Sequence, residues 1–434
     1  MCKKIAIIEL IFILFALGFM VISAFGADWS QWRGIDRNDI TSESSFPEKW
    51  PPKRIWDKNI GKGCTSPIIV NGKIYVMGWQ GEGDLNKNPI GTDTLYCLDA
   101  QTGKELWKQT YQCRYQSRIR IGDENQYGGP SSTPAFDLKT KFLYTLSIDG
   151  DLRCWDTSKN GQLIWSINLY DNYNIPQRSD VGRGKRDYGF TSSPLIYEDL
   201  VIVEVGSDEG TVIAFDKKTG QHKWASECKE SAGHTSGPVV LTVDGVKCLA
   251  TLTLKKLVVM RIDEGNEGKT IAEYPWQSDY ANNIPTPAII DNKILLTSGW
   301  NPKKTALIEV SLNGAVEKWR GKDFSQICSP IIHNGNIYMV DEQLKCLDLT
   351  NGQTKWKGGN FGYGSCLITK DDKIIAFGNG QLVLAEVNPS DNKYKEISIV
   401  KDIVPDICYP HIAFSNGIIC CKDKSGNIVC FSLK

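Results

Sequence analysis

Few residues in this sequence have types and spacings that could support chemistry. The stretch Cys408-Tyr409-Pro410-His411 lacks the second cysteine that a haem-attachment motif requires. There is also no nucleophile elbow, phosphate-binding loop or zinc pattern. The four histidines lack metal-ligand spacing, at His222, His234, His333 and His411. The sequence therefore predicts no catalytic residue and no metal ligand.

Cysteine is the remaining reactive side chain, and the chain has 14 of them. Cys420 and Cys421 are neighbours, an arrangement that could form a vicinal disulfide. However, they lie in an expected strand, where successive side chains point to opposite faces, and a bond between them would strain the backbone. We therefore expect both to be core residues, with a vicinal disulfide as the alternative.

The other cysteines fall at repeated positions. Cys97, Cys154, Cys346 and Cys430 occupy one slot that Ala214 and Ala385 share, which indicates a packing position for a small side chain. A second set lies near the start of the expected innermost strands, at Cys64, Cys328, Cys366 and Cys408. For this set we favour space-filling in a narrow channel, with a soft-metal or redox cluster as the alternative.

The element that positions these residues is an internal repeat. One phrase runs from a strand through Asp and a Gly-containing turn to Trp, as in Asp99, Gly103 and Trp107. Asp and Gly favour a tight hairpin turn, and the Trp that follows can dock its ring between neighbouring sheets. The Trp position recurs at residues 56, 107, 165, 224, 276, 319 and 356. The unit before the last one breaks the pattern, with Val387, Asp391 and Tyr394 in place of Asp, Gly and Trp.

A second phrase, a small residue followed by Pro and an alternating apolar strand, precedes each copy of the first and is clearest at Ser66-Pro67. Together the phrases give four short strands in about forty residues, the size of a propeller blade. Eight such units predict an all-β, eight-bladed β-propeller of four-stranded antiparallel blades docked by Trp. The last unit lacks an outer strand, and residues 54–60 can supply it, which would close the ring.

The N-terminus predicts export. Two lysines precede an apolar run, and Ala24 and Gly26 stand at the −3 and −1 positions of a cleavable signal peptide at residues 1–26. An uncleaved anchor is the alternative. Residues 27–53 then form a leader segment, and residues 54–434 form the propeller. We expect a periplasmic or envelope-associated monomer without a membrane span in the mature chain. The balance of 50 basic and 50 acidic residues gives no support for nucleic-acid binding.

The Asp-x-x-Thr-Gly-x-x-x-Trp phrase resembles the docking motif of bacterial propellers named for pyrroloquinoline quinone (PQQ) repeats. The opening at residues 28–34, Asp-Trp-Ser-Gln-Trp-Arg-Gly, is similar to the leader of an exported subfamily. That subfamily is likened to the outer-membrane-assembly lipoprotein of the Bam complex and to polyvinyl-alcohol dehydrogenase-like proteins. The resemblance implies either a binding scaffold or a calcium- and PQQ-dependent enzyme, because the same blades serve both. In such an enzyme, a disulfide between Cys420 and Cys421 would contact the quinone cofactor. This chain has no lipid-attachment Cys after the apolar run and no clear calcium set.

Three long insertions, near residues 80–93, 110–129 and 169–189, should share the face that carries the connections between blades. Long loops on a rigid scaffold usually carry binding specificity, and arginines in these loops suit an anionic ligand or acidic partner. A solvated loop surface is the alternative. The candidate binding residues are Arg118, Arg120, Tyr127, Arg183, Arg186, Tyr188, His234, Asn283 and Tyr409. We therefore expect a non-catalytic scaffold that needs no cofactor and binds a protein, peptide or polysaccharide. The alternative is the PQQ-dependent alcohol dehydrogenase.

Overall fold

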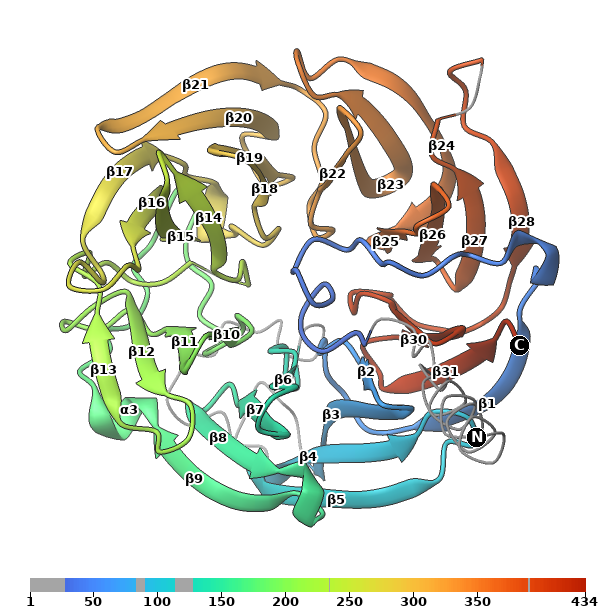
Figure 1. The fold of residues 1–434 in the computed structure, drawn as a ribbon, viewed down its shortest axis with the longest axis horizontal. Coiled ribbons are helices and arrows are strands. Elements are labelled where there is room, and N and C mark those ends of the chain that lie inside the picture. The colour runs from blue at the N-terminus through green and yellow to red at the C-terminus, as the bar shows by residue number, and fades with distance from the viewer. Residues whose placement is uncertain (1–27, 83–89, 114–127, 234, 389–390) are drawn as a thin grey trace, which may run out of the picture.

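Each repeat folds into one antiparallel sheet, and the sheets are arranged in a ring (Figure 1). We call the space enclosed by their inner strands the channel. The computed structural model describes residues 28–434 except 83–89, 114–127, 234 and 389–390. The predicted signal peptide lies outside the described residues. Within them, no helix is long and apolar enough to cross a membrane.

The first four blades each contain four strands in chain order. Blade 1 consists of β2 (Ile68–Val70), β3 (Lys73–Glu82), β4 (Ile90–Asp99) and β5 (Glu105–Gln112). Blade 2 consists of β6 (Ala135–Phe136), β7 (Phe142–Leu146), β8 (Asp151–Asp156) and β9 (Gln162–Asn168). Blade 3 consists of β10 (Leu195–Tyr197), β11 (Leu200–Glu204), β12 (Val212–Asp216) and β13 (His222–Ala225). Blade 4 consists of β14 (Val239–Val243), β15 (Val246–Leu252), β16 (Lys256–Arg261) and β17 (Thr270–Pro275).

The next three blades follow the same order. Blade 5 consists of β18 (Ala288–Ile290), β19 (Lys293–Ser298), β20 (Lys304–Ser311) and β21 (Gly314–Gly321). Blade 6 consists of β22 (Ile331–His333), β23 (Asn336–Asp348) and β24 (Thr354–Gly362). The first part of β23 pairs with β22 and its last part with β24, with Glu342 at a positive φ between them, so β23 fills both middle positions. Blade 7 consists of β25 (Ser365–Ile368), β26 (Lys373–Gly378), β27 (Gln381–Glu386) and β28 (Glu396–Val400).

The ring closes in blade 8, as the sequence predicts. This blade contains β29 (Ala413–Ser415), β30 (Ile418–Lys422) and β31 (Asn427–Ser432), and its outer strand is β1 (Lys53–Asn59) from the other end of the propeller. Trp56 of β1 pairs with Cys430 of β31. Helical structure in the described chain is limited to α3 (Leu169–Asn172) and three short 3-10 turns, η1 (Pro47–Lys49), η2 (Thr157–Lys159) and η3 (Asp279–Ala281).

Tryptophan rings join neighbouring blades by lying on turn glycines. The ring of Trp56 in blade 8 covers Gly103 in blade 1, and its Nε1–H donates a hydrogen bond to the Ala100 carbonyl at 2.9 Å. Trp319 makes the same pair of contacts with blade 6, over Gly352 and to the carbonyl of Leu349 at 2.9 Å. Only a residue without a side chain leaves room for the ring, which explains why the phrase requires Gly as well as Trp.

The strand register corrects one predicted docking position and clarifies another. In blade 4 the residue at the Trp position is Ala272, which pairs with Val259, so the assignment of Trp276 to the repeat was wrong. Trp276 is fully buried four residues later, beneath the Lys304 ammonium, which lies 4.3 Å from the ring centroid. In blade 7 Glu396 takes the position, and Tyr394 packs near Trp356 of blade 6 with ring centroids 6.1 Å apart.

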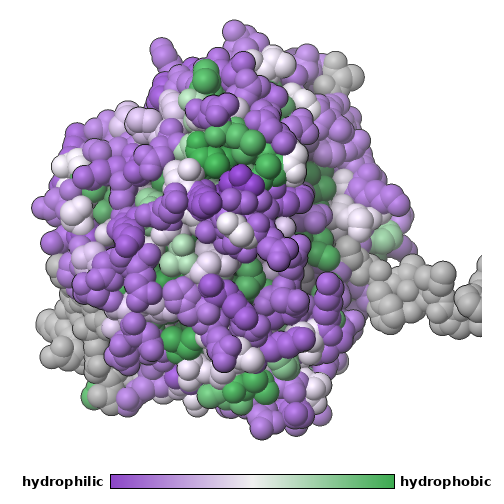
Figure 2. Space-filling model, turned by 60° about the vertical axis from the view of Figure 1, so that its left-hand side comes forward, coloured by the Kyte–Doolittle hydropathy of each residue, from purple (hydrophilic) through white to green (hydrophobic). Residues whose placement is uncertain are grey.

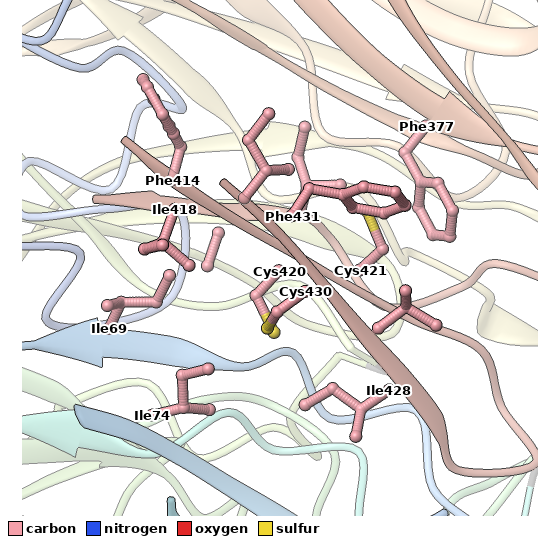
Figure 3. Packing of buried hydrophobic residues seen from close by; sticks show 14 of the residues in the cluster. Ile69, Ile74, Phe377, Phe414, Ile418, Cys420, Cys421, Ile428, Cys430 and Phe431 are labelled. Atoms are coloured by element: carbon pink, nitrogen blue, oxygen red, sulfur yellow. The ribbon is translucent and has the colours of Figure 1, made fainter. Parts of the chain in front are cut away.

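The small-residue slot lies opposite the docking tryptophan, and this location explains its size. Cys97 pairs with Tyr75 on one side and with Trp107 on the other, and the two ring centroids are 5.9 Å apart. A larger residue at the slot would separate the rings. In blade 8 the slot residue Cys430 faces Cys420, whereas Cys421 points to the other side of the strand (Figure 3). Both vicinal cysteines are fully buried and free, as expected of core residues.

A pair of glycines in blade 1 tests the docking contact. Gly103 and Gly72 have nearly the same left-handed φ, +67° and +69°, but a Cβ at Gly103 would lie 2.6 Å from the Trp56 ring, whereas nothing lies within 4 Å at Gly72. We expect Gly103→Ala to lower the free energy of unfolding by about 1–3 kcal/mol more than Gly72→Ala. Urea unfolding measures both, and equal losses would show that this contact does not stabilise the closed ring.

Candidate functional site

The leader segment crosses the channel rather than leaving the propeller (Figure 1, dark blue). Trp29 exchanges two backbone hydrogen bonds with Ile69 of blade 1, and the amide of Thr41 donates to the carbonyl of Ile368 in blade 7. Further along, the Glu43 carboxylate accepts hydrogen bonds from the amides of Asn416 and Gly417 in blade 8. The leader is therefore part of the folded ring. The sequence offered no prediction of this role.

Buried charges fix the leader inside the channel. The guanidinium of Arg33 lies 2.5 Å from the Asp39 carboxylate and donates a hydrogen bond to the carbonyl of Pro330 at 2.6 Å. Arg37 donates to the carbonyl of Pro194 across the channel at 2.9 Å. Burial opposes ionisation of Asp39, but Arg33 and His411 outweigh it and hold the pKa of Asp39 below its usual value. The leader thus satisfies carbonyls where the inner strands begin.

Above the leader, on the face that carries the connections between blades, lies a cavity that we call the upper cavity. Trp32 of the leader forms its floor beside His411, with ring centroids 4.4 Å apart, and donates a hydrogen bond to Thr286 at 3.0 Å. Its volume is about 100 Å³. The lining residues are Trp32, Cys64, Ser131, Arg186, Tyr188, Thr191, Ser193, Thr235, Asn282, Ile284, Trp300, Gln326, Ile327, Tyr409 and His411.

A second, lower cavity of about 460 Å³ lies on the opposite side of the leader, where the first and second strands of each blade are joined by turns. Its lining includes Gln31 and Arg33, the residues on either side of Trp32, together with inner-strand residues of blades 3 to 6. The leader therefore divides the channel. A ligand of the upper cavity enters from the face that carries the connections.

The structure brings together three of the predicted binding residues, since Arg186, Tyr188 and Tyr409 all line the upper cavity. Asn283 does not, because it is fully buried and its side-chain amide donates to the carbonyl of Thr253 at 2.9 Å. Arg183 lies outside the lining, 72 % exposed and paired with Asp279 at 3.1 Å. The remaining candidates fall outside the described residues, at Arg118, Arg120, Tyr127 and His234. The sequence missed Trp32, Trp300 and His411. The only signal for Trp32 was its place in the leader motif.

The third insertion forms part of the cavity wall by packing on the connection between blades 4 and 5. The Arg186 guanidinium lies 4.3 Å from the centroid of the Tyr280 ring, and the amide of Tyr280 donates to the carbonyl of Val181. Tyr280 and Ala281 both have left-handed backbone conformations, with φ of 60° and 54°. Non-glycine residues rarely adopt this conformation, and it persists where surrounding contacts fix it, often at binding sites.

A buried carboxyl group lies behind this wall. Glu204 ends β11 and accepts a hydrogen bond from the Thr251 hydroxyl. Burial raises the pKa of Glu204 to about 8, although Thr251, Ser192, Arg37 and Arg178 favour the charged form. The folded chain therefore favours neutral Glu204 over much of the physiological pH range.

The upper cavity does not offer the ligands that calcium prefers. Calcium binds six to eight oxygens, several of them from carboxylates, and the described lining contains no Asp or Glu. Across the described residues, no three His, Cys, Asp or Glu side chains are grouped to hold a metal ion. The vicinal cysteines also lie inside blade 8, away from this lining. Cys64 is the member of the channel-side cysteine set that reaches the cavity, while Cys328 and Cys366 pack in the core of blades 6 and 7.

A model of the family described as outer membrane protein assembly factor BamB matches residues 91–358, more than half of the chain. The chain belongs to this family. Among its relatives, the alcohol dehydrogenase (quinone) dehydrogenase subunit of Gluconobacter oxydans is 28% identical over 46% of this chain and 24% of the relative. BamB of Burkholderia pseudomallei is 24% identical over 40% of this chain and 33% of the relative. The aligned region thus spans about a quarter to a third of the length of these relatives.

Solved structures show the same architecture. BamB from Moraxella catarrhalis superposes with a TM-score of 0.56 at 10% identity, over 88% of this chain and 99% of that one. Quinohemoprotein alcohol dehydrogenase from Comamonas testosteroni superposes with a TM-score of 0.59 at 11% identity, over 95% and 81%. At such low identity these likenesses establish the fold alone.

Because the Arg33–Asp39 ion pair is buried, we expect the loss of either partner to lower the stability of the fold strongly. Removing one partner leaves the other charge buried without compensation, so we expect Arg33→Ala to cost about 3–5 kcal/mol in free energy of unfolding. The matched control is Arg54→Ala, which breaks an Arg–Asp pair with Asp57 at 3.0 Å whose side chains are 47% and 61% exposed. We expect that change to cost less than about 1 kcal/mol in urea unfolding. Similar losses for the two variants would contradict a buried anchor.

The raised pKa of Glu204 predicts that the stability of the fold depends on pH. Its raised pKa means that the neutral form stabilises the fold fully below pH 4.5, and this contribution is lost as pH rises towards about 8. We expect Glu204→Gln to remove that component, so that its free energy of unfolding falls less between pH 5 and pH 8 than in the wild type. Urea unfolding at both pH values measures this, with exposed Glu264→Gln as control. If the Glu204 variant kept the wild-type pH dependence, the raised pKa of Glu204 would be refuted.

Proposed function

We propose that this chain is an exported, non-catalytic propeller that binds a partner through the face carrying the connections between blades. The observation that supports the proposal best is the upper cavity, which the leader closes on one side and the third insertion borders on the other. Rigid blades hold its rim, and loops on a rigid scaffold are common binding sites. The partner class is a protein, peptide or polysaccharide.

The outer wall of the ring supports the proposal less well. Large apolar side chains are exposed there, including Val316 of β21 at 64%. On the side seen in Figure 2, apolar patches are separated by hydrophilic residues. A protein interface usually needs a more continuous apolar centre. The concave cavity therefore remains the better candidate for the binding site.

The alternative is a calcium- and PQQ-dependent alcohol dehydrogenase. In its favour, several relatives carry the name alcohol dehydrogenase (quinone). Against it, the described cavity lining has no carboxylate for calcium or for general-base work, and the vicinal cysteines lie within the blade. Export to the periplasm or envelope is part of both proposals, since one relative is named an outer membrane protein assembly factor.

Charge reversal on the two faces tests the proposed function. We expect the immobilised chain to retain proteins or polysaccharides from a cell-envelope extract, and Arg183→Glu/Arg186→Glu to reduce retention at least tenfold. The matched control, Lys104→Glu/Lys218→Glu, places the same charge change on exposed turns of the opposite face and should retain them normally. Equal retention by both variants would contradict binding at this face.

Calorimetric titration with PQQ, with and without calcium, tests the alternative. Micromolar, calcium-dependent binding would favour the dehydrogenase.

A further inference from the structure

The lining of the upper cavity restricts the chemistry of its ligand. Four aromatic residues contribute to it, Trp32 at the floor and Tyr188, Trp300 and Tyr409 around it. Trp300 is held edge to face against Tyr280, with ring centroids 6.1 Å apart. Aromatic residues present a flat apolar face and, in Trp and Tyr, a polar edge. They suit a ring-shaped ligand that has an apolar face and a polar rim.

Unpartnered polar atoms in the lining specify that rim further. The side-chain oxygen of Asn282, the indole nitrogen of Trp300 and Nε2 of His411 are all shielded from solvent and have no hydrogen-bond partner within the described chain. Buried polar atoms are nearly always hydrogen-bonded in folded proteins. The amide oxygen accepts, the indole N–H donates, and the imidazole nitrogen can do either. A ligand with several hydroxyl groups can satisfy all three, because each hydroxyl both donates and accepts.

The charge of the lining favours an anion. Arg186 brings a guanidinium to the wall, and the described lining has no carboxylate to oppose a negative ligand. The carboxylates beside the lining already have cationic partners: Asp187, between Arg186 and Tyr188 in the chain, pairs with Arg178 at 3.5 Å, and Asp39, 3.5 Å from Nδ1 of His411, pairs with Arg33. A guanidinium recognises a carboxylate with two parallel hydrogen bonds, which gives direction as well as charge.

The size of the cavity limits the ligand to one small ring. The cavity volume is about 100 Å³, which favours one small ring over a bulkier group. Since the leader closes the channel below, a longer molecule must extend outward past the loops.

We propose that the upper cavity binds the terminal hexuronate unit of an acidic polysaccharide, an inference that rests on the binding role proposed for this face. The apolar side of the pyranose ring lies against the aromatic residues, its hydroxyls satisfy Asn282, Trp300 and His411, and its carboxylate meets Arg186. A peptide terminus fits less well, because one residue brings a carboxylate but too few hydroxyls for the three unpartnered atoms.

Calorimetric titration with trigalacturonate tests the inference, with maltotriose as the neutral sugar of equal length. We expect the purified chain to bind trigalacturonate at least tenfold more tightly than maltotriose, and the affinity to fall with added salt because a partly exposed ion pair is screened. Arg186→Gln should lose at least tenfold in affinity for trigalacturonate and little for maltotriose. Lys104→Gln is the control, since Lys104 is an exposed lysine in a turn of the opposite face. Its affinity should stay within threefold of the wild type.

A second variant addresses the hydroxyl contacts. Trp300→Phe keeps an aromatic ring and removes the N–H donor, so we expect a several-fold loss for both sugars together, unlike the loss in Arg186→Gln. Equal binding of the two sugars, absence of sugar binding, or tighter binding of PQQ or of a carboxyl-terminal tripeptide would overturn the inference. If sugars do not bind while envelope components are still retained through Arg183 and Arg186, the proposed function stands and only the hexuronate assignment fails.

Discussion

The contact between a tryptophan ring and a turn glycine is the interaction on which the rest of this structure depends. A blade of four short strands cannot bury both of its faces alone, so its stability comes from the next blade. The ring of Trp56 or Trp319 covers a glycine across the boundary and also donates a hydrogen bond to a backbone carbonyl there. A boundary that carries this contact is therefore fixed in both distance and register, and strand β1 completes the circle.

A closed ring creates a second constraint at its centre. The inner strands begin around one narrow channel, and buried carbonyls there must find donors. Arg33 and Arg37 of the leader supply them to Pro330 and Pro194, and Asp39 offsets the charge of Arg33. Filling the channel in this way divides it in two. The upper cavity is thus a consequence of how the ring satisfies its own interior, and Trp32 lies at its floor for the same reason.

The blades could be predicted from the sequence because their signals are local: Asp, Gly and Trp of one phrase lie within nine residues, as in Asp99 to Trp107. The misassigned Trp276 shows the limit, since residue type suggested a docking position that the register gives to Ala272.

The floor of the cavity could not be predicted. Arg33 and Pro330 are 297 residues apart, and only the closed ring brings them together. Tyr188 and Tyr409 were predictable because they precede inner strands, whereas Asn283 occupies an equivalent place and turns inward.

The distribution of carboxylates connects the fold to the proposed function. In blades 1, 3 and 6, Asp99, Asp216 and Asp348 accept hydrogen bonds from backbone amides in the turn before the outer strand. Those turns lie on the face opposite the upper cavity, and the buried carboxylates near the channel are paired with arginine or neutralised by burial. The repeat thus uses its acidic residues to build turns and anchors. What remains at the described cavity lining are aromatic, hydroxyl, amide, thiol, imidazole and guanidinium groups, and the proposed function uses them to hold a polar anionic ligand in place.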